Sequence, residues 1–169
     1  MKKILFLCHG NICRSPAAEI LFNDEARKLG IGDRVRAESA ALSDEAVGLS
    51  IYSPMRRVLA SEGFKDASHV SRQATGADIA SSDLVVVMDE ENLGLYRRRF
   101  GSLGSGKVRL LLSYAGGGEI DDPWYTRDFR RAFNEIQLGT RALAGQLARD
   151  LAEASQDERH GRAAGHADD

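Results

Sequence analysis

The chain has 169 residues, a formal net charge of −2 and a hydrophobic fraction of 43%, which suits one globular domain with a single core. The near-neutral charge argues against nucleic acid or a membrane surface as a partner, and no apolar run has the length of a signal peptide core or a membrane span. The only cysteines are Cys8 and Cys13, so no disulfide framework is expected. We therefore expect a protein of a reducing compartment, the cytoplasm.

Strand-like and helix-like segments alternate along the chain. The clearest strand is Leu84–Met88, a continuous apolar and mostly β-branched run of the kind that is covered on both faces. Ser15 and Pro16 suit the N-cap and the first position of the first helix. In chain order, we expect strands at residues 3–7, 34–41, 84–88 and 108–112, and helices at residues 16–29, 53–63, 91–100 and 129–151.

Helices between strands imply a parallel sheet with right-handed crossovers, hence a doubly wound α/β domain. We place this domain at residues 1–152. Residues 153–169 are rich in charge, alanine and glycine and contain no large apolar residue, which predicts a polar, flexible tail. His160 and His166 in this tail have no obvious partners for a metal.

Residues 8–15 read Cys-His-Gly-Asn-Ile-Cys-Arg-Ser and lie between the first strand and the first helix. A tight loop at a strand–helix junction turns its backbone N–H groups inward and binds phosphate, helped by the helix dipole. Arg14 can grip two phosphate oxygens with its planar fork. Cys8 would lie in the same positive field, which favours the nucleophilic thiolate. This arrangement suits an enzyme that attacks a phosphate monoester with sulfur.

Residues 8–16 match every fixed position of the pattern Cys-x-Gly-Asn-x-Cys-Arg-Ser-Pro, and residues 122–125 read Asp-Pro-Trp-Tyr. The chain therefore resembles the low molecular weight protein-tyrosine phosphatases over roughly residues 2–151. The resemblance implies a four-stranded parallel sheet flanked by helices on both faces. It also implies hydrolysis of phosphotyrosine through a phosphocysteine intermediate, with no cofactor and no metal.

The leaving phenolate of phosphotyrosine needs a proton, and the resemblance assigns this general-acid role to Asp122. A carboxyl group can serve only while protonated, and a second carboxylate at Asp121 would favour that form if both faced the site. Asp121 is the second candidate for the acid.

The other site residues follow from the resemblance and from the loop. Cys8 is the nucleophile and Arg14 the phosphate clamp, and the Ser15 hydroxyl can donate to the sulfur. Trp124 and Tyr125 match the aromatic pair that lines the substrate cleft. The expected phosphate-binding residues are His9, Gly10, Asn11, Ile12, Cys13 and Ser15, and Asn11, Ser39 and His69 are expected to hold the loop by hydrogen bonds. We also expect Cys8 and Cys13 to form a reversible disulfide under peroxide.

Two positions depart from the family pattern. His9 stands where many relatives carry an apolar residue. Glu45 stands where many relatives place an aromatic side chain that flanks the substrate. The chemistry is unaffected, but the preference among peptide substrates is open.

Three alternatives share the phosphate loop: a protein-arginine phosphatase, an arsenate reductase and a non-catalytic phosphopeptide-binding module. Ile12 and Tyr125 favour phosphotyrosine over phosphoarginine. An arsenate reductase would need a further cysteine pair, and no cysteine follows Cys13. The intact set of Cys8, Arg14 and Asp122 argues against a silent module. The expected partner is a phosphotyrosine-containing protein, for which a tyrosine kinase is one candidate, and the expected oligomeric state is a monomer or weak dimer.

Overall fold

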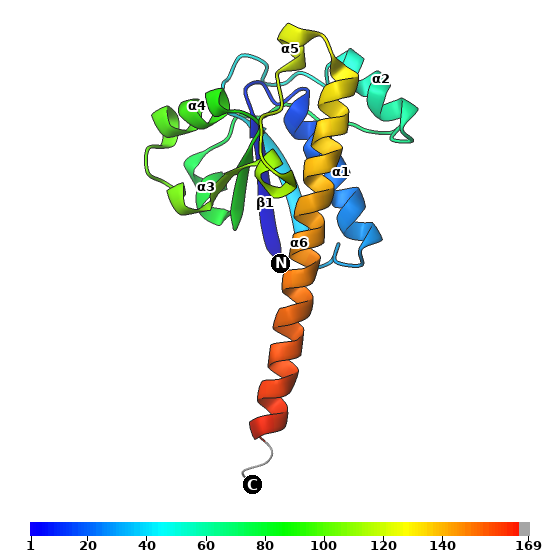
Figure 1. Cartoon of the computed structure of the whole chain (residues 1–169). Coiled ribbons are helices and arrows are strands. Elements are labelled where there is room, and N and C mark those ends of the chain that lie inside the picture. The colour runs from blue at the N-terminus through cyan, green and yellow to red at the C-terminus, as the bar shows by residue number, and fades with distance from the viewer. Residues whose placement is uncertain (166–169) are drawn as a thin grey trace.

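Four parallel strands form the centre of the structure, a computed structural model that describes residues 1–165 (Figure 1). The strands are β1 (Lys2–Cys8), β2 (Val35–Ala41), β3 (Leu84–Val87) and β4 (Val108–Leu110), and their order across the sheet is β2-β1-β3-β4. The chain passes from β1 to β2 on one side and then crosses to β3 on the other. The predicted doubly wound parallel sheet is therefore confirmed, and its switch point lies between β1 and β3.

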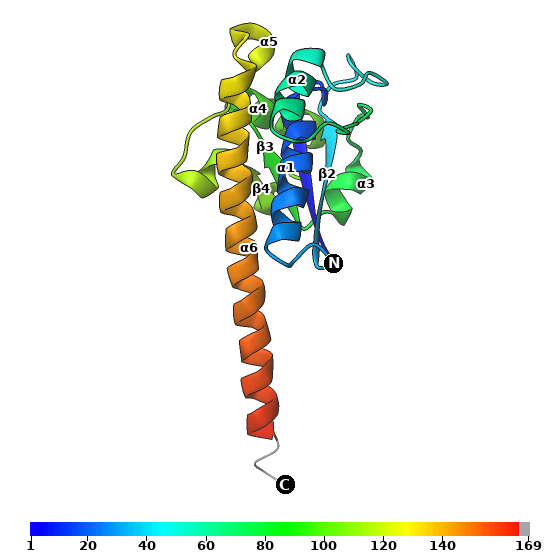
Figure 2. The ribbon, with the colours of Figure 1, turned by 90° about the vertical axis from the view of Figure 1, so that its right-hand side faces the viewer.

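Helices cover both faces of this sheet (Figure 2). Helices α1 and α6 pack together on one face, while α3 and α4 cover the other. The helices are α1 (Arg14–Lys28), α2 (Ser53–Ser61), α3 (Gly76–Ser81), α4 (Glu90–Phe100), α5 (Pro123–Thr126) and α6 (Phe129–Gly165), with 3-10 turns at Ser105–Lys107 and Leu111–Ala115.

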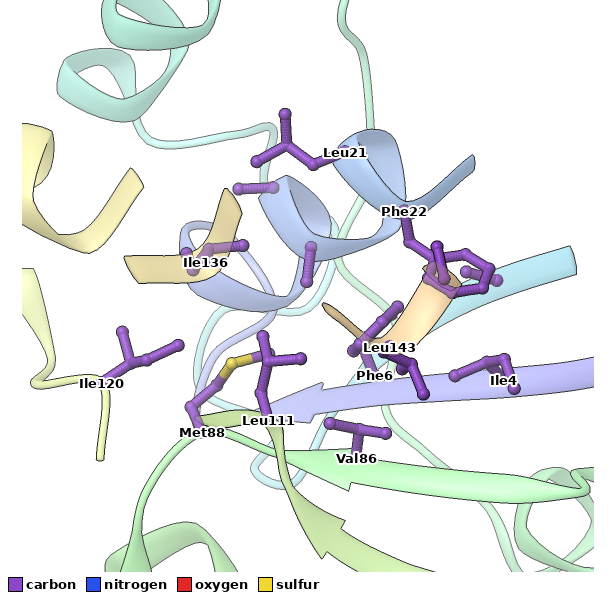
Figure 3. Packing of buried hydrophobic residues seen from close by; sticks show 14 of the residues in the cluster. Ile4, Phe6, Leu21, Phe22, Val86, Met88, Leu111, Ile120, Ile136 and Leu143 are labelled. Atoms are coloured by element: carbon purple, nitrogen blue, oxygen red, sulfur yellow. The ribbon is translucent and has the colours of Figure 1, made fainter. Parts of the chain in front are cut away.

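The apolar character of β1 follows from this coverage. Consecutive side chains of a strand point to opposite faces, so Ile4 and Phe6 join the cluster beneath α1 and α6, and Leu5 and Leu7 join the one beneath α3 and α4. Figure 3 shows the first cluster, in which Phe6 lies among side chains of the sheet and of both helices. A strand buried on both faces cannot alternate between apolar and polar residues.

The start of α1 and the end of β4 differ from the prediction, and two short helices are additional. Helix α1 begins at Arg14 with Cys13 at its N-cap, because the hydroxyl of Ser15 contacts the Cys8 sulfur instead of capping the helix. Strand β4 stops at Leu110, and the next five residues form a 3-10 turn. The short helices α3 and α5 were not predicted, although a capping box of Thr75 and Asp78 opens α3.

Helix α6 continues well beyond the point where we expected it to end. Leu151 is the last side chain packed against the core, yet the helix runs to Gly165 and projects past the domain (Figure 1). The segment 153–165 is thus helical, and its flexibility stays a prediction. His166 lies outside the described residues. Within residues 1–165, no helix combines the length and apolar character needed to cross a membrane.

Candidate active site

Cys8 is the last residue of β1 and lies at the switch point of the sheet. Its sulfur is 3.0 Å from the Ser15 hydroxyl oxygen and accepts a hydrogen bond from the Asn11 backbone N–H at 3.3 Å. The side-chain amide of Asn11 donates to the Ser15 oxygen at 2.7 Å, so the Ser15 proton is free to point at the sulfur. Two donors thus converge on Sγ, and they stabilise negative charge there.

The Asn11 side chain ties the loop to two other segments. Asn11 has a left-handed backbone with φ of 57°, a conformation that asparagine tolerates better than most residues. Its amide nitrogen donates to Ser39 at 3.0 Å, and its amide oxygen accepts from the Arg72 backbone N–H at 3.2 Å and contacts His69 Nε2 at 2.7 Å. Because that oxygen can only accept, His69 Nε2 must carry the proton. The supporting roles predicted for Asn11, Ser39 and His69 agree with this geometry.

Arg14 lies in the first turn of α1 with its side chain 3% exposed. Nη1 donates to Asp89 at 2.6 Å and to the Ile120 carbonyl at 2.7 Å, while Nη2 lies 3.5 Å from Asp122. Burial alone would lower the pKa of this guanidinium, but the charges of Cys8, Asp89 and Asp122 raise it above its ordinary value. The side chain is therefore a permanent cation. Its hydrogen bonds to Asp89 and Ile120 both come from Nη1, so the other N–H groups of the guanidinium can donate to a ligand oxygen.

Asp122 is the N-cap of the short helix α5 and faces Arg14. One carboxylate oxygen accepts from the Trp124 backbone N–H at 3.0 Å, and the other is the oxygen near Arg14 Nη2. Asp121 points elsewhere, into a separate surface cavity that it shares with Arg131. The structure thus places Asp122 in the same cavity as the Cys8 sulfur. The expectation that Asp121 could serve as the second candidate for the acid is wrong, because Asp121 lines a different cavity.

A cavity of about 290 Å³ opens above the loop. One wall is aromatic: the rings of Tyr52 and Trp124 are 5.1 Å apart, and Phe129 is 5.7 Å from Tyr52. Trp124 is 53% exposed and Tyr125 is 79% exposed, so both remain available to an incoming ring. The cavity is lined by Cys8, His9, Gly10, Asn11, Ile12, Cys13, Arg14, Glu45, Ala46, Leu49, Tyr52, Asp122, Trp124, Tyr125 and Phe129.

The sequence did not predict roles for Asp89, Tyr52, Phe129 or Ser71. Asp89 orients Arg14, the two aromatic residues line the cavity, and the Ser71 hydroxyl donates to the Gly10 carbonyl at 2.8 Å. Of these, Asp89 could have been placed near the site, because it lies two residues after β3, the neighbour of β1 at the switch point where ligands bind. Its pairing with Arg14 had no signal in the sequence.

Cys13 differs from Cys8 in its surroundings. It is partly buried against the core, and burial raises the pKa of its thiol, with the charges of Cys8 and Asp122 adding to the effect and Arg14 opposing it. Cys13 is therefore a neutral thiol, and its disulfide with Cys8 stays a prediction. Within residues 1–165, no group of three or more histidine, cysteine, aspartate or glutamate side chains is placed to hold a metal ion.

Comparison with known proteins gives consistent matches. Residues 3–153 match the model of the low molecular weight phosphotyrosine protein phosphatase family. The low molecular weight protein-tyrosine-phosphatase YfkJ of Bacillus subtilis is 31% identical over 89% of this chain and 98% of its own length. Its crystal structure covers 89% of this chain and 96% of that one, with a TM-score of 0.82.

Two further relatives are informative. A low molecular weight protein-tyrosine-phosphatase of Streptomyces coelicolor is 35% identical over 96% of this chain and 98% of its own. The arginine phosphatase YwlE, which Bacillus subtilis contains, is 29% identical in sequence. Its structure matches with a TM-score of 0.74 and covers 88% of this chain and 97% of that one. A protein named as a tyrosine phosphatase and one named as an arginine phosphatase thus both share the fold of this chain.

Proposed function

Since the chain belongs to the low molecular weight phosphotyrosine protein phosphatase family, we propose that it hydrolyses phosphotyrosine in proteins with Cys8 as nucleophile. The observation that carries this assignment is the sulfur at the floor of the cavity, which meets two hydrogen-bond donors and lies in the same cavity as Arg14 and Asp122. Nucleophile and cation come from one segment, residues 8–14, and the acid comes from a distant one. Their meeting is what phosphoryl transfer requires.

In the first step, the Cys8 thiolate attacks phosphorus in line with the leaving oxygen. An S–P bond forms, the P–O bond to the tyrosine ring breaks, and Asp122 gives its proton to the departing phenolate. Arg14 and the backbone N–H groups of residues 9–14 stabilise charge on the three equatorial oxygens. The products of this step are tyrosine and a phosphocysteine.

In the second step, water attacks the phosphocysteine. Asp122, now ionised, takes a proton from the water as the new P–O bond forms and the S–P bond breaks. The Ser15 hydroxyl, 3.0 Å from the sulfur, stabilises the thiolate as it leaves. Inorganic phosphate is released, and Cys8 and Asp122 return to their starting forms.

Phosphotyrosine fits this cavity better than phosphoarginine. Ile12, in the phosphate loop, supplies an apolar side chain to the cavity lining, and the rings of Tyr52 and Trp124 offer a face on which a phenyl ring can pack. We further propose a cytoplasmic location, because the thiol must stay reduced. A tyrosine-phosphorylated protein, such as a tyrosine kinase, is the proposed partner, and the proposed oligomeric state is a monomer or weak dimer.

The test compares three peptides of one sequence that carry phosphotyrosine, phosphoarginine or phosphoserine, assayed without added metal. We expect the highest kcat/KM for phosphotyrosine. Cys8→Ser should lower turnover by at least about a thousandfold, because a serine hydroxyl is a much weaker nucleophile than a thiolate. Mass spectrometry of the rapidly quenched wild type should find phosphate on Cys8. Preference for phosphoarginine would overturn the substrate assignment, and full activity of Cys8→Ser would overturn the mechanism.

A further inference from the structure

We propose that Glu45, paired with His9 at the mouth of the cleft, makes this phosphatase prefer phosphotyrosine that is flanked by a lysine or arginine. The proposal rests on the proposed function, because it concerns the residues beside the same phosphotyrosine. Its basis is the contact between Glu45 and His9, two side chains that line the cavity of the Cys8 sulfur.

Glu45 lies in the loop between β2 and α2, and its carboxylate accepts from or pairs with His9 Nε2 at 3.0 Å. Both side chains line the cavity that holds the Cys8 sulfur. The side chain of Glu45 is 72% exposed, whereas that of His9 is 36% exposed. The carboxylate is therefore at the outer edge of the cavity, where it meets what surrounds the phosphotyrosine rather than the phosphate itself.

The loop that carries Glu45 is fastened to the phosphate loop. The Leu42 backbone N–H donates to the Cys8 carbonyl at 3.0 Å, and the Ser43 N–H and hydroxyl both donate to the His9 carbonyl, at 3.0 and 2.9 Å. Figures 1 and 2 place this loop at the same edge of the molecule as α5. The position of the carboxylate relative to the sulfur is thus set by backbone hydrogen bonds as well as by His9.

The geometry leaves Glu45 with binding capacity. His9 contacts Oε2, and Oε1 has no hydrogen-bond partner within residues 1–165. An exposed pair of this kind is weak, so it can admit a third, cationic group without a large cost. A lysine or arginine beside the phosphotyrosine can reach the free oxygen while the ring is between the cavity walls.

A second charge, behind the aromatic wall of the cavity, gives the preference a direction. The guanidinium of Arg127, which follows α5, lies 5.6 Å from the ring centre of Tyr52 and 5.9 Å from that of Trp124. A basic flanking residue is repelled by this cation and attracted by Glu45. The preference should therefore appear at the residue on one side of the phosphotyrosine and be weak on the other side.

The experiment uses phosphotyrosine peptides that differ only in carrying lysine, glutamine or glutamate at the residue before or after the phosphotyrosine. Each kcat/KM is divided by that of the same protein on a small aryl phosphate, so that changes in the chemistry cancel. For the wild type, we expect a lysine-to-glutamate ratio of about three- to tenfold at one of the two positions. Glu45→Gln should bring this ratio close to one, and Glu45→Lys should invert it.

Glu153→Lys is the matched control, because it makes the same charge change on the exposed, projecting part of α6. It should keep the wild-type ratio, since a distant surface charge is screened. An unchanged ratio in Glu45→Lys, or an equal change in Glu153→Lys, would overturn the proposal while leaving the phosphatase assignment intact. Hydrolysis of the aryl phosphate but of none of the peptides would overturn both.

Discussion

Around the Cys8 sulfur, each polar atom has a partner that fixes its direction. The Arg72 backbone N–H donates to the Asn11 amide oxygen, which sets the orientation of that amide. The amide nitrogen then donates to the Ser15 hydroxyl, which lies beside the sulfur. Among the described residues, no buried side-chain nitrogen or oxygen lacks a hydrogen-bond partner. Such a network holds its donors in place before the substrate arrives, so little reorganisation is needed when charge develops.

Replacing Asp122 by asparagine should separate leaving groups according to how much protonation they need. Asparagine can keep the cap on the Trp124 N–H but cannot give a proton. We expect kcat for phosphotyrosine to fall about 10²- to 10⁴-fold, with a much smaller fall for aryl phosphates whose phenolates are stable. The measurement is kcat across a series of substituted phenyl phosphates, with Asp121→Asn as the control. An equal loss across the series would remove Asp122 from the acid role.

The stability of the fold should decrease at mildly acidic pH because of His69. Burial lowers the pKa of His69, and the charge of Arg72 lowers it further. The unfolded chain, with a histidine pKa of about 6.5, then binds more protons than the folded one as pH falls below that value. Stability is therefore fully present above about pH 6.5 and is lost toward the lower pKa of the folded state, at no more than about 1.4 kcal/mol per pH unit.

Urea unfolding at several pH values between 7.5 and 5.5 measures this dependence. His69→Asn should be less stable than the wild type at pH 7.5, because the bond to Asn11 at 2.7 Å is lost, but its stability should vary less with pH. His160→Asn, on the exposed part of α6, should keep the wild-type slope. If His69→Asn and the wild type show the same slope, another group is responsible.

At the scale of elements, α6 packs closely against the 3-10 turn that follows β4, with Gly139 next to Leu111. A Cβ added at Gly139 would lie 2.6 Å from Cγ of Leu111 and 3.0 Å from its Cδ1. Leu111 is fully buried, so it has little room to move. Glycine at this point of the helix is therefore a packing requirement, although it is unfavourable for an isolated helix.

Two glycine substitutions in α6 should act in opposite directions. Gly139→Ala should lower the free energy of unfolding by about 1–2 kcal/mol, because the overlap with Leu111 outweighs the gain in helix propensity. Gly145→Ala meets only the flexible end of Arg149, at 3.5 Å, and should raise the free energy of unfolding by up to about 1 kcal/mol. Urea denaturation of both variants tests the pair. Equal stabilisation by the two would show that α6 can shift away from Leu111.

At the scale of the whole molecule, the features that could be predicted are those whose residues are close together in the sequence. Cys8 and Arg14 belong to one strand–loop–helix unit, and the central strands β1 and β3 are apolar runs, so the loop and these strands could be recognised from local pattern. The partners of Arg14 could not, since Asp89 and Ile120 reach it only through the crossovers that follow β2 and β3. The pairing of His9 with Glu45 likewise depends on a loop conformation that no local signal specifies.

The folded domain and helix α6 end at different places in the chain. Beyond Leu151, the described side chains of α6 are exposed or half-buried and project from the domain. A chain ending at Gln156 keeps Leu151 and the Ser155 bond to its carbonyl. We expect it to lose far-UV helical signal while its free energy of unfolding stays within about 0.5 kcal/mol of the full chain and its kcat/KM on an aryl phosphate stays the same. A larger loss of stability would mean that the projecting helix contributes to the fold, and the domain would then extend past residue 152.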